Sequence, residues 1–212
     1  MLPVPAAFQS AVTNSFQKIA EADFPTRFGH FRIYGFQGCH GGELEEAVVL
    51  RMGDLEQGPP PLVRVHSECL TGDVFHSLRC DCRAQLELSL AQIAEEGRGL
   101  LVYEHQEGRG IGLLNKLRAY ELQDEGADTV EANEWLGFQA DHRSYELPAE
   151  ILRYFGLREV RLLSNNPQKI EALERAGVRV VERVPCQVEP TDTTETYLRT
   201  KKEKLGHLLE GL

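Results

Sequence analysis

The sequence has no long hydrophobic run, no signal-like start and no even set of cysteines. Its apolar stretches are much shorter than the ~20 residues of a membrane-spanning helix, so we expect no membrane partner. The first residues show no basic segment followed by an apolar one, so we expect no secretory signal. Cysteines number 5, and an odd count argues against a disulfide framework and for a reducing compartment. We therefore expect a cytoplasmic protein.

Positive charge is also scarce in this chain. Lys and Arg number 23 against 33 Asp and Glu, which leaves a formal net charge of -10. Nucleic-acid binding needs a basic face, so this balance argues against a nucleic-acid partner. It does not exclude a nucleotide substrate, because the local field of a few converging basic residues can hold phosphates. Each basic residue close to a motif is therefore a candidate phosphate ligand.

The length of 212 residues suits one sizeable hydrophobic core. The contents of 42% hydrophobic and 26% charged residues are those of an ordinary soluble domain. We expect an N-terminal appendage over residues 1–22, with a helix from Phe8 to Ala22. A single domain is expected over residues 23–209, and no internal repeat is visible.

Hydrophobic periodicity predicts the fold class. Apolar and polar residues alternate over 28–36, and further strands are predicted over 47–52 and 62–66, which together indicate N-terminal antiparallel strands. The remaining elements are predicted as helix 85–96, strand 99–103, helix 113–125, strand 159–164, helix 167–176, strand 178–182 and an amphipathic helix 193–209. Strand–helix–strand units imply parallel pairing. The predicted class is therefore α/β, a mixed β-sheet with flanking helices.

Three cysteines lie within fourteen residues, at Cys69, Cys80 and Cys82. The Cys-x-Cys pair is too tight for an ordinary disulfide and suits a turn that directs both sulfurs at one ion. Zinc held by three protein ligands keeps an open position, where a bound water becomes acidic. A fourth ligand from His66, His76 or Cys39 would instead make the site structural. The spacing predicts a zinc site and favours a catalytic one.

A glycine-rich segment, Gln106–Gly112, follows the strand predicted over 99–103 and leads into a helix. Its glycines let backbone N–H groups approach an anion, and the helix N-terminus adds a favourable dipole. The spacing matches neither a dinucleotide fingerprint nor a P-loop. The alternative to an anion site is a flexible strand–helix turn.

Two further segments carry candidate groups. Ser164 to Lys169 follows a predicted strand, and Lys169 lies near the first turn of the next helix, where it opposes the helix dipole. That position suggests an anionic ligand, and the alternative is a solvated lysine. Asp141 and Arg143 share one side of an extended segment and suit proton transfer and phosphate stabilisation, with a surface ion pair as the alternative. Three C-terminal lysines are predicted to form a solvated helix face, namely Lys201, Lys202 and Lys204.

Taken together, these segments resemble GTP cyclohydrolase II. The resemblance implies hydrolysis of GTP to 2,5-diamino-6-ribosylamino-4(3H)-pyrimidinone 5′-phosphate, formate and diphosphate, the first step of riboflavin biosynthesis. It also implies zinc, magnesium with the substrate phosphates, and a homodimer. The matching segments run in order over residues 23–209 and are 64–73, 78–82, 106–116, 118–120, 128–133, 136–138, 164–167, 182–185 and 202–207.

The resemblance also implies roles for individual residues. Cys69, Cys80 and Cys82 would bind zinc. Asp141 would accept a proton, Tyr120 would assist ring opening and deformylation, and Arg143 would act at the α-phosphorus as nucleophile or as electrostatic stabiliser. The residues implied to contact GTP are Arg64, Val65, His66, Ser67, Glu68, Gln85, Glu107, Gly108, Arg109, Thr129, Ser164 and Lys169.

Three positions depart from the family's pattern. They are His105, where arginine is usual, Arg83, where glycine is common, and Ser164, where threonine is usual. The loss of a permanent cation at His105 bears on triphosphate binding and on product choice. Two rival functions stay open at this point. One is a paralogue that stops at the formamidopyrimidine product or uses another purine nucleotide, and the other is a non-enzymatic nucleotide-binding module with structural zinc.

Overall fold

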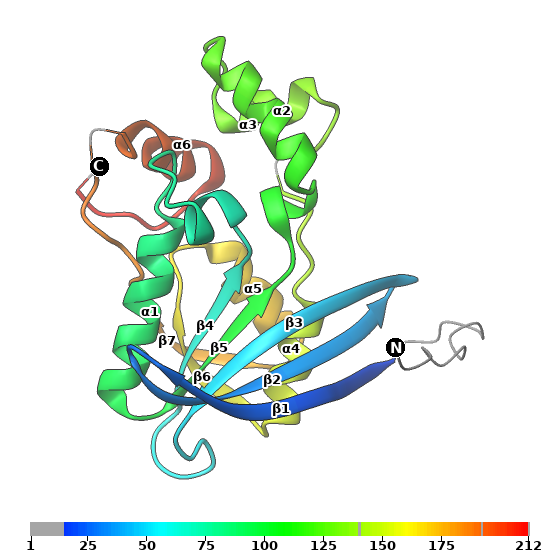
Figure 1. The fold of residues 1–212 in the computed structure, drawn as a ribbon, viewed down its shortest axis with the longest axis vertical. Helices are drawn as coiled ribbons and strands as arrows, with labels where there is room; N and C mark the ends of the chain where they lie inside the picture. The colour runs from blue at the N-terminus through cyan, green and yellow to red at the C-terminus, as the bar shows by residue number, and fades with distance from the viewer. Residues whose placement is uncertain (1–14, 140, 192, 212) are drawn as a thin grey trace, which may run out of the picture.

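The protein folds around one seven-stranded mixed sheet with helices on both faces (Figure 1). The computed structural model describes residues 15–139, 141–191 and 193–211. The strands are β1 (Phe16–Thr26), β2 (Gly29–His40), β3 (Glu43–Met52), β4 (Leu62–Ser67), β5 (Gly99–Glu104), β6 (Glu159–Leu163) and β7 (Arg179–Val184). The helices are α1 (Cys82–Glu96), α2 (Leu113–Asp124), α3 (Thr129–Trp135), α4 (Glu146–Tyr154), α5 (Pro167–Arg175) and α6 (Glu195–Leu205). The predicted α/β class with a mixed sheet is confirmed.

The strand order is β1-β2-β3-β5-β4-β6-β7. β1, β2, β3 and β5 pair antiparallel, whereas β5, β4, β6 and β7 run parallel. Ser67 lies opposite Glu104 in the β4–β5 register, so both strands end at the same edge. Polar segments that follow parallel strands meet at such an edge, which is where open α/β sheets bind ligands.

The helix predicted from Phe8 to Ala22 is wrong over the residues that the structure describes. Residues 16–22 belong to β1, where Phe16 pairs with Gly38 and Ala22 with Ile33 on β2. The Phe16 ring stacks on Phe36, with ring centroids 5.5 Å apart. β1 is an edge strand with mostly exposed side chains, so its pairing partner rather than a local pattern decides its structure. Residues 8–14 of the predicted helix lie outside the described residues.

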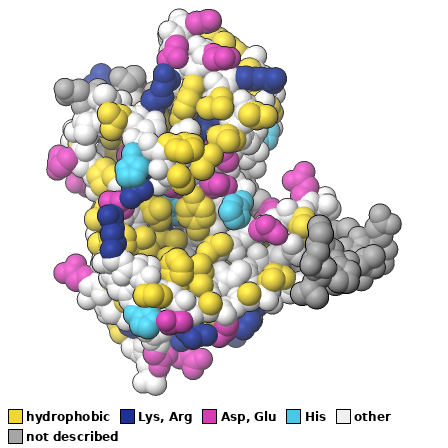
Figure 2. All heavy atoms as spheres, in the orientation of Figure 1, with side chains coloured by type: hydrophobic (Ala, Val, Ile, Leu, Met, Phe, Trp, Pro, Cys, Tyr) yellow, Lys and Arg dark blue, Asp and Glu magenta, His cyan; other side chains and the backbone are white. Residues whose placement is uncertain are grey.

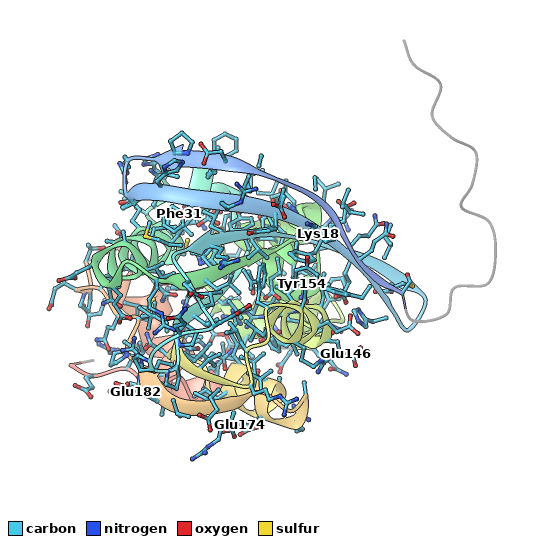
Figure 3. The ribbon with its side chains drawn as sticks, turned by 90° about the horizontal axis from the view of Figure 1, so that it is seen from below. Lys18, Phe31, Glu146, Tyr154, Glu174 and Glu182 are labelled. Atoms are coloured by element: carbon cyan, nitrogen blue, oxygen red, sulfur yellow. The ribbon has the colours of Figure 1, made fainter. Side chains whose placement is uncertain are left out.

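Two hydrophobic layers hold the helices on the sheet. On one face Val63 and Val65 pack with buried residues of α4 such as Ile151. On the other face Leu62 and Phe31 pack with α1. Figure 3 shows Phe31 beside α1 and Tyr154 at the end of α4. Because side chains alternate along a strand, Arg64 and His66 follow Leu62 onto the face covered by α1.

α2 and α3 form a small lobe that stands away from the sheet (Figure 1). Ala119, Ala127 and Ala132 make its own small core. α3 begins at a capping box, in which Asp128 accepts the Val130 and Glu131 N–H groups and Glu131 accepts the Asp128 N–H group. No helix among the described residues is long and apolar enough to cross a membrane.

Candidate active site

A cavity of about 140 Å³ opens at the carboxyl edge of β4, β5 and β6. Its walls come from these strand ends, the start of α1, the α2–α3 lobe and α6. Figure 2 shows hydrophobic side chains running down the middle of one face of the molecule, from this lobe towards the sheet. The predicted site residues that line the cavity are Arg64, His66, Ser67, Glu68, Cys69, Cys80, Cys82, Gln85, Glu107, Gly108, Arg109, Thr129, Tyr120, Arg143, Ser164 and Lys169.

The three cysteines form one compact sulfur group. Their Sγ atoms lie within 4.8 Å of one another, and those of Cys69 and Cys80 are 3.7 Å apart. Thiolates around a tetrahedral zinc stand about 3.8 Å apart, given a Zn–S bond of ~2.3 Å. A π-helical turn, η1 (Leu70–Val74), returns the chain past these sulfurs. A Cβ at Gly72 would lie 2.9 Å from the Cys80 sulfur, so only glycine fits there.

The donor set fits a soft divalent metal. A hydrogen bond from Cys80 holds the pKa of the Cys69 thiol far below its usual range, while the same bond raises the pKa of Cys80 to about 11. Three such close thiols need a cation before all can ionise. Among the described residues no other Cys, His, Asp or Glu joins the group. His66 instead contacts the Asp73 carboxylate at 3.2 Å, so it is not the fourth ligand.

Lys116 on α2 ties the sulfur group to the glycine-rich segment. Its Nζ donates to the Cys69 sulfur at 3.1 Å and to the Glu107 carboxylate at 2.7 Å. The other Glu107 oxygen accepts the Leu70 N–H group at 2.7 Å. Burial alone would lower the pKa of Lys116, but Cys69 and Glu107 hold it above its usual range. Lys116 is therefore a fixed positive charge beside a candidate metal ligand.

Tyr120 lies one helical turn further along α2, close to the same sulfurs. Its hydroxyl is 3.1 Å from the Thr71 hydroxyl, which is itself 3.6 Å from the Cys69 sulfur. The Arg79 guanidinium lies over the Tyr120 ring, 4.8 Å from its centroid. Burial raises the pKa of Tyr120, so its hydroxyl keeps its proton. Tyr120 can therefore donate a hydrogen bond within the cavity.

The glycine-rich segment forms a short 3-10 turn, η2 (Glu107–Gly110), with unusual backbone angles. Gly108 and Arg109 both have a φ of 63°, and the Gly108 N–H group donates to the Glu107 carboxylate at 2.9 Å. This conformation is strained for Arg109, which has a Cβ. Both terminal nitrogens of Arg109 are buried without a hydrogen-bond partner among the described residues. Strain and unpaired charge together indicate an anion-binding site.

A second group of cations surrounds Ser67. The Lys169 Nζ donates to the Val65 carbonyl at 2.8 Å and to the Ser67 hydroxyl at 3.3 Å, and Arg143 donates to that hydroxyl at 3.2 Å. Ser67 donates to the buried Glu104 carboxylate at 2.5 Å. Burial lowers the pKa of Lys169 to about 7, with Glu104 opposing this and Arg143 adding to it. The Lys169 side chain is buried, and this burial excludes the predicted alternative of a solvated lysine.

Asp141 and Arg143 form a largely buried ion pair rather than a surface one, with side chains 14% and 12% exposed. The Arg143 backbone N–H and Nε both donate to Asp141 Oδ1, at 3.0 and 2.9 Å, and its NH2 group donates to Oδ2. Burial would raise the pKa of Asp141, but Arg143 holds it below its usual range. Asp141 lies behind Arg143 and does not itself line the cavity.

Other predicted residues differ in their placement. The Val65 side chain packs in the core, and only its carbonyl is directed to Lys169. His105 is exposed and pairs with Glu68 at 3.1 Å, and Arg83 donates to the Asp73 carbonyl. The roles assigned to the site residues stay predictions.

The cavity also contains residues that the motifs did not single out. They are Arg79, Gln106, Ile111, Lys116, Ala119, Gln123, Asn133, Asn165, Asn166, Tyr197, Lys201 and His207. Nine of these twelve lie within the matching segments, so a signal was present for all of them except Gln123, Tyr197 and Lys201. The solvated face predicted for Lys201 is wrong, because its side chain is buried against Asp81.

Comparisons with known proteins place this chain in a family. The family model described as GTP cyclohydrolase II matches residues 17–185. GTP cyclohydrolase-2 of Shigella boydii is 56% identical over 193 residues, covering 91% of this chain and 97% of the relative. GTP cyclohydrolase-2 of Actinobacillus succinogenes is 54% identical, covering 91% of this chain and 88% of the relative.

A comparison with solved structures matches RibBX, a two-domain 3,4-dihydroxy-2-butanone 4-phosphate synthase from A. baumannii. The match has a TM-score of 0.46 and 20% identity, and covers 82% of this chain and 40% of that chain. The family assignment depends on the sequence matches, which confirm the resemblance. Since the family model spans most of the chain and the curated relatives share more than half of the aligned residues, this chain belongs to the GTP cyclohydrolase II family.

Proposed function

We propose that this chain hydrolyses GTP to 2,5-diamino-6-ribosylamino-4(3H)-pyrimidinone 5′-phosphate, formate and diphosphate, the first step of riboflavin biosynthesis. One observation carries the proposal: a single cavity holds the three-sulfur group together with Arg109, whose guanidinium nitrogens are buried and unpartnered. The first feature suits a metal that activates water for hydrolysis, and the second suits a phosphate chain. The curated relatives named GTP cyclohydrolase-2 support the same reaction.

Cys69, Cys80 and Cys82 are the residues that would hold zinc, one ion per chain. When bound, zinc supplies an acidified water for attack at guanine C8. The described residues contain no second group of His, Cys, Asp or Glu at metal-ligand spacing. Magnesium would therefore enter with the substrate phosphates, which it commonly does in nucleotide sites.

The guanine end of the substrate would lie near Tyr120. Its protonated hydroxyl, beside Thr71 and Cys69, can orient a water or polarise the formamide that ring opening produces. Gln85 and Thr129 line the same cavity and can hydrogen-bond the purine edge or the ribose. The remaining proposed GTP contacts are Arg64, Val65, His66, Ser67, Glu68, Glu107, Gly108, Arg109, Ser164 and Lys169.

The phosphates would lie against the cations around Ser67 and η2. We assign Arg143 an electrostatic role at the α-phosphorus, because its guanidinium donates to Asp141 and Ser67 and stays charged at any physiological pH. Asp141 is ionised and orients Arg143, and we propose it as the proton acceptor of the reaction. Arg109 and Lys169 would balance the developing negative charge on the leaving diphosphate.

The proposal extends to assembly and location. Several large apolar side chains are exposed, including Phe75 at 71%, Leu78 at 70% and Leu114 at 75%. Exposed apolar groups of this size are typical of protein interfaces, and we propose a homodimer. The five cysteines are free, which suits a reducing compartment, and we propose a cytoplasmic enzyme.

The test combines metal analysis with two product assays on GTP. We expect one zinc per chain and release of both formate and diphosphate. Cys80→Ser should abolish formate release, whereas Arg143→Ala should abolish diphosphate release while zinc stays bound. A ring-opened product without formate would instead favour the paralogue that stops at the formamidopyrimidine. Zinc binding without any turnover would favour the non-enzymatic module and contradict the proposed reaction.

A further inference from the structure

The C-terminal helix α6 forms part of the cavity wall although it lies beyond residues 17–185, which the family model matches. Tyr197 and Lys201 of α6, and His207 just after it, line the cavity. Figure 1 shows α6 beside one end of α1, and Cys80 and Cys82 lie at the N-terminal end of α1. A helix that only covered the surface would direct its charged residues to solvent, and α6 does not do so at Lys201.

Lys201 makes a buried ion pair with Asp81. The Lys201 side chain is 10% exposed and that of Asp81 is 2% exposed, with Nζ 2.8 Å from Oδ1. Asp81 stands between Cys80 and Cys82, at the N-cap of α1. Two charges that are buried as a pair depend on each other, because removal of one leaves the other without a partner in a poorly solvated place. Lys201 therefore holds the turn that carries two of the three sulfurs.

The pair extends into the cavity through Gln85. The second Asp81 oxygen accepts a hydrogen bond from the Gln85 amide nitrogen at 2.5 Å. The Gln85 amide oxygen in turn accepts from Arg64 at 2.7 Å. Both ends of the Gln85 amide are thus engaged, and its orientation is set by Asp81. A continuous chain of contacts leads from α6 to a cation of the cavity.

Other contacts of α6 lie at the rim. Lys204 pairs with Asp128 and with Glu131 of α3, and the Glu131 distance is 2.9 Å. The Lys204 side chain is 39% exposed, so these pairs are largely solvated and contribute little. Lys204 therefore offers a matched control, since it has the same side chain and lies on the same helix.

We propose that Lys201 is a positioning residue of this site. Through Asp81 it holds the Cys80–Cys82 turn and the Gln85–Arg64 pair in the geometry that binds metal and substrate, so that docking of α6 and assembly of the metal site are coupled. The substrate part of this inference rests on the proposed function, whereas the metal part does not.

The experiment compares Lys201→Met with Lys204→Met in the full-length protein. Zinc affinity is measured by chelator competition, the sulfur geometry by the thiolate-to-cobalt absorption of the cobalt-loaded protein, and substrate binding by KM for GTP. Lys201→Met should weaken zinc affinity at least tenfold, alter the cobalt spectrum and raise KM, and Lys204→Met should stay within twofold of the wild type. Equal behaviour of the two variants would overturn the inference.

Two further variants keep the test decisive if Lys201→Met folds poorly. Lys201→Arg retains a donor to Asp81 and should restore zinc affinity to within about threefold. Asp81→Asn combined with Lys201→Met removes both charges and should fold, with zinc affinity no weaker than in either single variant. Additive losses would show that the two residues act separately. A wild-type protein that binds zinc but does not hydrolyse GTP would contradict the proposed function. The inference about Lys201 would then be decided by the zinc and cobalt measurements alone. A wild-type protein without zinc affinity would overturn both the proposed function and this inference.

Discussion

Burial changes the charge of individual residues around the proposed phosphate site. Lys169 is only 5% exposed and is surrounded by Arg64 and Arg143, which oppose its protonation, and by Glu104 and Asp141, which favour it. The result is a lysine whose pKa is about 7. The protein therefore has a cation near the substrate whose charge changes within the physiological range.

This protonation gives a pH prediction. Below a pH of about 7 Lys169 is charged and attracts the triphosphate, and above it the amine becomes neutral. GTP binding should therefore weaken as pH rises through neutrality. Above neutral pH, formation of the complex should be accompanied by uptake of a proton. In wild type, KM for GTP should rise across this range, and in Lys169→Met it should be higher throughout and flatter. An equally steep rise in the variant would assign the pH dependence to another group.

Tyr120 gives a prediction about product identity. Tyr120→Phe keeps the ring under Arg79 and removes only the hydroxyl that contacts Thr71, so the fold should survive. We expect ring opening to continue while deformylation falls by roughly 10²-fold or more, which is typical when a general acid–base group is lost. Mass spectrometry should then detect the formamidopyrimidine nucleotide. Undiminished formate release would leave Tyr120 with a packing role.

At the level of elements, η2 combines a strained backbone at Arg109 with the proposed binding of substrate phosphates. Arg109 adopts a left-handed conformation that costs a residue with a Cβ roughly 1 kcal/mol or more relative to glycine. The segment is held by Glu107, which accepts from Lys116 and from the Leu70 N–H group. The rest of the site therefore maintains a loop that is unfavourable by itself.

Substitution of Arg109 should separate stability from affinity. Arg109→Gly removes the strain and the unpaired guanidinium together, so the melting temperature should stay equal or rise while KM for GTP rises at least about tenfold. Arg109→Ala should raise KM similarly but be less stable than the glycine variant, because alanine keeps the Cβ. Calorimetry and steady-state kinetics check both quantities. A lower stability of Arg109→Gly than of Arg109→Ala would refute the assignment of strain.

For the molecule as a whole, the sulfur group joins segments that the sheet alone does not hold together. Cys69 follows β4, and Cys80 and Cys82 lie at the start of α1, with η1 between them. A metal bound there stabilises the native state, by about 2.7 kcal/mol when the free metal is at a hundred times its Kd. The site is therefore expected to contribute to folding as well as to chemistry.

Chelation should expose this contribution. Removal of zinc should lower the melting temperature, and added zinc should restore it. Cys82→Ser should melt at the lower temperature with or without zinc, because a neutral hydroxyl is a weak zinc ligand. Cys39→Ala is the control, since Cys39 lies outside the sulfur group and its variant should respond to zinc like the wild type. A melting temperature that is insensitive to chelation in the wild type would contradict a bound zinc.

The sequence by itself determined the fold class and the composition of most of the site. Alternation of apolar residues predicted the strand over 28–36, which is part of β2. The predicted end of helix 85–96 is also correct, because Gly97 follows α1 in a left-handed conformation. These signals are local, because they depend on the repeat of a strand or a helix and on the backbone freedom of glycine. The cysteine spacing likewise predicted a metal site, and the geometry of the three sulfurs fits one. The capping-box pattern that begins at Asp128 is also a local signal, and it could have predicted the start of α3.

Only the tertiary structure decided which partner each ambiguous segment or charge has. Residues 16–22 carry a pattern that suits a helix, but β2 offers them a strand partner. The sequence around Lys201 suggests a solvated lysine, whereas in the fold its side chain donates a hydrogen bond to Asp81, 120 residues away in the sequence. Val65 and Arg64 are neighbours in one motif, yet the pleat of β4 sends one into the core and the other towards α1. In each case the deciding energy comes from burial against residues that are distant in the sequence, and no local pattern records it.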